Sequence, residues 1–184
     1  MSNTSIRLRL ALGVLMLAGA CLAADPPPAA KARPAAPGIS AADAFARMKT
    51  LVGEWAGKAG EGQGDADVRV VYRLTGAGSA LVETLSPGSP HEMITVYHLD
   101  GDRLMMTHYC AAGNQPRMTL TAASTPQELV FAFSGATNLK SDKDMHMHDL
   151  SIRFVDPDHI VGEWVSFQDG RKAGTTTFSV ARVK

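Results

Sequence analysis

The sequence lacks net charge: Lys plus Arg and Asp plus Glu each total 18 among 184 residues, which gives a formal net charge of zero. Proteins that attract nucleic acid or anionic lipid through charge carry a basic patch or an excess of Lys and Arg. We therefore expect no nucleic-acid partner.

Cysteine is scarce as well, and several catalytic motifs are missing. The chain has two cysteines, Cys21 and Cys110. If Cys21 leaves with an N-terminal signal, no internal disulfide can form. The sequence contains no Gly-x-Ser-x-Gly, no phosphate-cradling glycine loop and no His-Glu-x-x-His. It therefore offers no recognisable catalytic core, and an enzyme is not the favoured interpretation.

No apolar run is long enough for a transmembrane helix. Leu10 to Leu22 is apolar but too short to span a bilayer, and it follows the basic residues Arg7 and Arg9. This pattern predicts a signal peptide over residues 1–24, cleaved after Ala23 or Ala24. The mature protein is then periplasmic or secreted.

A second interpretation of the N-terminus stays open. The stretch from Leu17 to Cys21 resembles a lipobox, which would make Cys21 a lipidated N-terminus and the protein an envelope-anchored lipoprotein of structural role; Ala18 stands where that motif usually has leucine. Residues 25–39 are rich in Pro and Ala, which favours an extended tether over a packed element.

Residues 40–184 are expected to form one domain. Ser40 can cap a helix, with Asp43 three residues later, and Phe45, Met48 and Val52 recur at helical spacing. We predict a helix of about three turns that Gly53 ends.

From Trp55 onward the hydrophobic period changes from 3.6 residues to two, and strands follow strands. The predicted strands lie near residues 54–59, 67–74, 79–85, 92–99, 103–110, 117–122, 128–134, 145–155, 159–168 and 173–183. Asp100-Gly101 and Asp169-Gly170 are typical of hairpin turns. The predicted fold is all-β, a closed antiparallel barrel of about 8–10 strands with the short helix capping one end.

Gly53-Glu54-Trp55-Ala56-Gly57 resembles the Gly-x-Trp signature of the calycin superfamily, which includes lipocalins, fatty-acid-binding proteins and nitrobindin. The block from Val96 to Leu104, continuing to Met118, is similar to exported lipocalin-like domains of unknown function. The resemblance implies that Arg182, near the end of the last strand, stacks over Trp55.

The resemblance does not extend to haem binding. Nitrobindin-like members bind haem through a histidine on a strand close to the C-terminus, and that strand here reads Thr175-Thr176-Thr177-Phe178-Ser179-Val180. Ala59 also replaces a third evenly spaced glycine. We expect no haem and no other obligatory cofactor.

Alternation places several polar side chains on the face that we expect to look inward. His146 and His148 share a face with Leu150, Ile152 and Phe154, and His108 and Cys110 share one with Leu104 and Met106. Glu83 and Glu163 interrupt apolar strands, where an inward carboxyl would have a raised pKa, and outward orientations are equally compatible with the pattern. Arg117 lies in a predicted loop with Asn114, Gln115 and Pro116, where it can bind an anionic group.

These features predict an exported binding protein for a small hydrophobic or amphipathic molecule held inside the barrel. The candidate ligand-binding residues are Tyr97, Glu83, His108, Arg117, His146 and His148. The alternative is a metal-dependent or acid/base enzyme in which His108, Cys110, His146 and His148 converge on zinc or copper.

Overall fold

The computed structural model describes residues 38–61 and 65–184. The predicted signal peptide, Cys21 and the predicted tether up to residue 37 lie outside this part of the chain. Within it, no helix has the length and apolarity needed to cross a membrane.

The helix α1 spans Ala41–Lys49 and begins at Ser40, whose Oγ accepts a hydrogen bond from the Asp43 amide at 3.1 Å. Ala44, Phe45 and Met48 are buried in the same core as the barrel interior. The predicted helix end at Gly53, with Val52 on the apolar face, is wrong. The helix ends at Lys49, four residues before Gly53, so helical spacing does not determine which side chains are buried after that residue. Leu51 is buried and Val52 is exposed.

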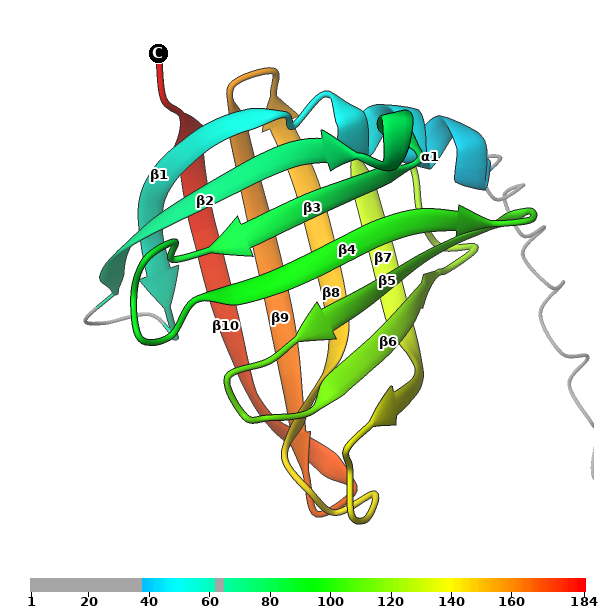
Figure 1. The fold of residues 1–184 in the computed structure, drawn as a ribbon, viewed down its shortest axis with the longest axis vertical. Helices are drawn as coiled ribbons and strands as arrows, with labels where there is room; N and C mark the ends of the chain where they lie inside the picture. Colours follow the sequence, from blue (N-terminus) through cyan, green and yellow to red (C-terminus); the bar gives the residue numbers. More distant parts are fainter. Residues whose placement is uncertain (1–37, 62–64) are drawn as a thin grey trace, which may run out of the picture. The chain divides into compact units, whose positions relative to one another are not determined.

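Ten antiparallel strands close into a single barrel, with α1 at one end (Figure 1), as the period-two pattern predicted. The order around the barrel is β1-β10-β9-β8-β7-β6-β5-β4-β3-β2, so each strand pairs with its sequence neighbours and β10 pairs with β1. The strands are β1 Gly53–Gly60, β2 Ala66–Thr75, β3 Ala80–Leu85, β4 Met93–Asp100, β5 Arg103–Tyr109, β6 Gln115–Leu120, β7 Glu128–Thr137, β8 His146–Asp156, β9 His159–Gln168 and β10 Arg171–Arg182.

Large side chains fill much of the interior. Alternate residues are buried along β2, β4, β5 and β6, and the largest fully buried side chains come from the helix, from the turn after it and from β1 and β3–β7. These are Trp55, Tyr97, Phe131, Met48, Leu51, Leu81, Leu104, Met106, Met118 and Leu129. The barrel is therefore packed rather than hollow over much of its volume.

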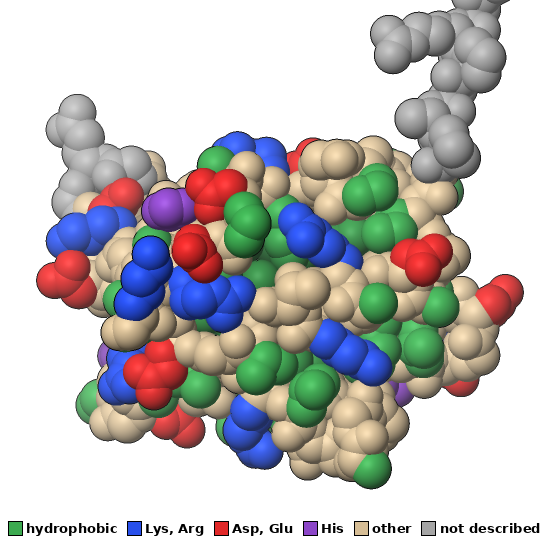
Figure 2. Space-filling view, turned by 90° about the horizontal axis from the view of Figure 1, so that it is seen from above, with side chains coloured by type: hydrophobic (Ala, Val, Ile, Leu, Met, Phe, Trp, Pro, Cys, Tyr) green, Lys and Arg blue, Asp and Glu red, His purple; other side chains and the backbone are tan. Residues whose placement is uncertain are grey.

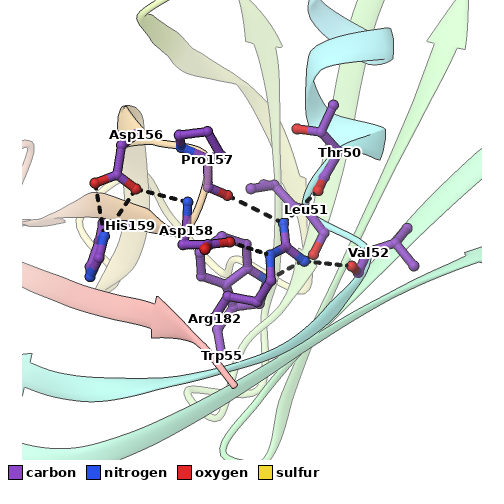
Figure 3. A network of polar contacts seen from close by, with 9 residues as sticks. All are labelled: Thr50, Leu51, Val52, Trp55, Asp156, Pro157, Asp158, His159 and Arg182. Atoms are coloured by element: carbon purple, nitrogen blue, oxygen red, sulfur yellow. Dashed lines mark hydrogen bonds and ion pairs between the residues drawn. The ribbon is translucent and has the colours of Figure 1, made fainter. Parts of the chain in front are cut away.

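Closure of the barrel places Arg182 opposite Trp55 in the β1–β10 register. The guanidinium carbon lies 4.4 Å from the indole ring centroid, so the stacking implied by the calycin resemblance is present. Arg182 also donates to the Val52 and Thr50 carbonyls at 2.9 and 2.8 Å and to Asp158 at 3.2 Å (Figure 3). One side chain thus ties the last strand to the helix end and to the β8–β9 turn.

Gly53 makes room for this contact. Its φ of 129° lies in the region that favours glycine, and a Cβ there would sit 3.1 Å from Arg182 Nη1.

The surface of the barrel end that carries the helix mixes Lys and Arg with Asp and Glu, among apolar side chains (Figure 2). This face therefore carries no field of one sign.

We predict that Arg182→Lys lowers the free energy of unfolding by about 1.5–3 kcal/mol, because an ammonium group cannot stack flat on the indole and reach the same acceptors. Urea denaturation at pH 7 measures the change. Arg103→Lys is the matched control, because Arg103 forms an exposed ion pair with Asp100 and should change stability by no more than about 0.5 kcal/mol. Equal losses in the two variants would contradict the prediction.

Candidate functional site

A row of polar side chains crosses four neighbouring strands inside the barrel. Tyr72 of β2 pairs with Glu83 of β3, Glu83 with Thr95 of β4, and Thr95 with His108 of β5. All four are buried. The strand registers therefore align one inward residue from each strand into a single line, which we call the polar row.

Hydrogen bonds connect the polar row with Tyr97, which faces inward two residues after Thr95. The Tyr97 hydroxyl donates to Glu83 Oε2 at 2.5 Å, and Thr95 Oγ1 lies 2.9 Å from His108 Nδ1. Tyr72 lies opposite Glu83 in the strand register, and Thr95 lies two residues from Tyr97 on the same inward face. The polar row and Tyr97 thus form one series of neighbouring polar groups from a carboxyl group to an imidazole.

The hydrogen bonds along this series of polar groups run in one direction when Glu83 is ionised. A carboxylate only accepts, so Tyr97 donates to Glu83, which leaves the Tyr97 oxygen available to accept from the Thr95 hydroxyl. Thr95 then accepts from His108 Nδ1–H. His108 is left as the neutral tautomer whose Nε2 carries a lone pair.

Burial favours the neutral forms of Glu83 and His108, which lie at the two ends of this series. It raises the pKa of Glu83 to about 7, although the hydrogen bonds from Tyr97 and Tyr72 act in the opposite direction. It lowers the pKa of His108 to about 4. Burial and the neighbouring Glu83 charge also raise the pKa of both Tyr72 and Tyr97. His108 is therefore uncharged at neutral pH.

His108 forms part of the wall of a cavity of about 120 Å³. Its ring centroid lies 4.5 Å from that of Trp164. The other lining residues are Leu85, Met93, Met147, Thr176 and Phe178. An apolar cavity of about 150 Å³ can bind benzene, so the space suits one small ring or a short chain. It is smaller than the roughly 300–1,000 Å³ typical of sites for drug-sized ligands.

His146 and His148 lie in a different pocket from His108, which corrects the expected common interior face. A register shift between Met147 and Asp149 breaks the alternation of β8. Met147 lines the cavity beside His108, whereas the two histidines line a second pocket with Phe133 and Phe167. The face predicted from strict period two therefore holds only from Leu150 onward.

The four-donor metal site is not formed. Across residues 38–61 and 65–184, no group of three or more His, Cys, Asp or Glu side chains is arranged to hold a metal ion. β5 ends at Tyr109, so Cys110 lies in the following turn and leaves the strand face of His108. The bulge in β8 separates the other two donors from His108.

Two further candidates face outward. Gln115–Arg117 belong to β6 rather than to a loop, and Arg117 is exposed on the outer face. Glu163 is exposed on β9, whereas Glu83 points inward. Of the predicted ligand-binding residues, Tyr97, Glu83 and His108 come together, and Arg117 lies away from them.

The sequence reasoning missed Tyr72, Thr95 and Trp164. Tyr72 and Thr95 follow the same alternation as their buried neighbours Val70 and Tyr97, which is a usable signal for the interior face. Their alignment with Glu83 depends on strand register, which the alternation leaves undetermined.

The two shifted pKa values predict opposing effects of pH on stability. Folding raises the pKa of Glu83 from 4.5 to about 7, so its stabilising contribution is complete below pH 4.5 and is lost as the pH rises through about 7. Folding lowers the pKa of His108 from 6.5 to about 4, so its contribution is present above pH 6.5 and is lost as the pH falls through about 4.

We therefore expect Glu83→Gln and His108→Phe to change the pH dependence of unfolding in opposite directions. Relative to the unmodified protein, Glu83→Gln should gain stability as pH rises from 4.5 to 7, and His108→Phe should lose it from pH 4 to 6.5, each by up to about 3 kcal/mol. Urea titrations at half-unit pH steps measure both differences. Curves that stay parallel to that of the unmodified protein would refute the assigned shifts.

No protein-family model matches the chain, and no curated protein sequence is significantly similar to it. Among solved structures, it is similar to a protein of unknown function from the DUF3598 family of Nostoc punctiforme PCC 73102, with a TM-score of 0.51 and 13% identity. The match covers 74% of this chain and 48% of that one, so the chain spans about half the length of this neighbour. At this identity the likeness concerns the fold alone, a closed antiparallel barrel compatible with a calycin-like architecture.

Proposed function

We propose that the protein is an exported binding protein that holds a small apolar or amphipathic molecule in the interior cavity beside His108. The observation that carries the proposal is a single oriented imidazole in a wall that is otherwise almost entirely apolar. Sites of this composition bind through apolar contact and use a few placed polar groups for orientation.

The chemistry of His108 defines the preferred ligand. With Glu83 ionised and Nδ1 donating to Thr95, the remaining ring nitrogen of His108 accepts a hydrogen bond, so it favours a hydroxyl or N–H group over a carboxylate. A neutral ligand also avoids placing a second negative charge near Glu83. A small phenol or alcohol meets both conditions.

The cavity walls allow some adjustment in size. Met93 and Met147 line the cavity, and methionine side chains repack around different shapes more readily than branched or aromatic ones. Trp164 and Phe178 supply flat surfaces on which a ring can pack. We expect ligands larger than one ring to require displacement of a methionine.

We predict that p-cresol binds more tightly than toluene, roughly three- to tenfold, because only p-cresol can donate to His108 Nε2. The fluorescence of Trp164 in the cavity wall provides the titration signal. His108→Phe should retain toluene binding and lose the preference for p-cresol. No binding of either compound at millimolar concentration, or an unchanged preference in His108→Phe, would refute this site.

Export is the second part of the proposal and rests on the N-terminal pattern of Arg7, Arg9 and the apolar run to Leu22. We expect the exported protein to begin at Ala24 or Asp25, with an intact mass that matches removal of the preceding residues. An N-terminus at Cys21 carrying the added mass of acyl chains would instead establish the lipoprotein form.

A further inference from the structure

A second pocket lies where β7 and β8 separate. The two strands pair only between Glu128–Ala132 and Asp149–Arg153, although β7 continues to Thr137 and β8 begins at His146. Four rings, from Phe133, His146, His148 and Phe167, gather beyond the end of this pairing. They come from three strands and share no residue with the His108 cavity.

The imidazole of His148 is held between two phenyl rings. Its centroid lies 4.8 Å from that of Phe133 and 3.8 Å from that of Phe167, with interplanar angles of 17° and 16°. Both faces of the imidazole are therefore covered. A ligand can approach only its edge.

A chain of hydrogen bonds sets the tautomer of this edge. His146 Nδ1 lies 2.8 Å from the Asp144 carbonyl oxygen and can only donate to it, so His146 Nε2 is an acceptor in the neutral ring. His148 Nδ1 lies 3.1 Å from His146 Nε2 and must donate to it. His148 Nε2 is left with a lone pair, and no group in the described part of the chain bonds to it.

The loop before His146 is itself ordered by Asp144. Its carboxylate accepts from the Lys140 amide at 2.8 Å and from the Ser141 hydroxyl at 3.1 Å, while its carbonyl oxygen holds His146. These bonds lower the pKa of the Asp144 carboxyl. Partial burial lowers the pKa of His148, which favours the neutral ring.

The pocket around this imidazole has a volume of about 430 Å³ and a largely apolar lining. This volume falls within the roughly 300–1,000 Å³ typical of small-molecule sites. Besides the four rings, the wall consists of Gly135, Ala136, Leu139, Ser141, Asp142 and Gly170. Asp142 disfavours anionic ligands, and the aromatic wall favours flat ones.

We propose that this pocket is a second binding site, for an uncharged aromatic alcohol of two fused rings whose hydroxyl donates to His148 Nε2. The site is independent of the proposed function at His108, because the two pockets have separate walls and because such a ligand exceeds the His108 cavity. The register shift between Met147 and Asp149 accompanies this separation: Met147 lines the His108 cavity, whereas His146 and His148 line the second pocket.

Calorimetric titration of the full chain with 2-naphthol and with 2-methylnaphthalene, which lacks the donor, tests the proposal. We expect 2-naphthol to bind roughly fivefold more tightly. His148→Phe keeps a ring between Phe133 and Phe167 and removes the acceptor, so it should bring the two affinities within twofold. His108→Phe should leave the preference unchanged, which separates this site from the interior cavity.

A second measurement avoids dependence on the variants. Nitrogen-15 chemical shifts of the histidine rings should show His148 protonated at Nδ1 and unprotonated at Nε2 at pH 7, with the Nε2 resonance moving on addition of 2-naphthol. Equal affinities for the two compounds, retention of the preference in His148→Phe, or an Nε2-protonated His148 would each overturn the proposal.

Discussion

Closure of the sheet is the constraint on which the rest of the structure depends. Once β10 pairs with β1, every inward side chain shares one enclosed space, and no strand edge remains at that junction. Arg182 secures this junction by covering Trp55 and bonding to backbone carbonyls at the helix end. A polar side chain that points inward must then form its hydrogen bonds with side chains from other strands. The polar row is the consequence of that requirement.

Burying Glu83 disfavours folding relative to an apolar residue, since a buried carboxyl needs partners in either protonation state. Tyr72 and Tyr97 supply those partners, and Thr95 extends the connection to His108. The benefit is the orientation of His108. Its neutral imidazole can adopt two tautomers, and the hydrogen bond to Thr95 determines which nitrogen keeps a lone pair. Protonation of Glu83 removes the reason for that assignment, because a neutral carboxyl can also donate. The chemical character of the cavity wall therefore depends on a proton held two strands away.

The alternation of apolar and polar residues was sufficient to predict the fold and part of the site. It placed His108 inside because period two holds without interruption along β5. It left open which face of residues 92–99 points inward, and the β4–β5 register shows that Thr95 and Tyr97 lie on that face. The alternation gave wrong predictions where the strands became irregular or ended. The bulge between Met147 and Asp149 moved two histidines away from His108, and the early end of β5 removed Cys110 from the strand face. Bulges and strand ends depend on pairing with neighbouring strands, so a single strand's pattern does not reveal them.

The two imidazole sites follow one physical rule although they occupy different pockets. In each, Nδ1 is bonded within the protein, to Thr95 Oγ1 for His108 and to His146 Nε2 for His148, and the ring packs against an aromatic neighbour. In each, burial lowers the pKa and favours the neutral ring. A neutral, stacked imidazole with one assigned nitrogen is a directional acceptor in apolar surroundings, where a hydrogen bond is stronger than in water. That combination selects uncharged donors over anions at both places.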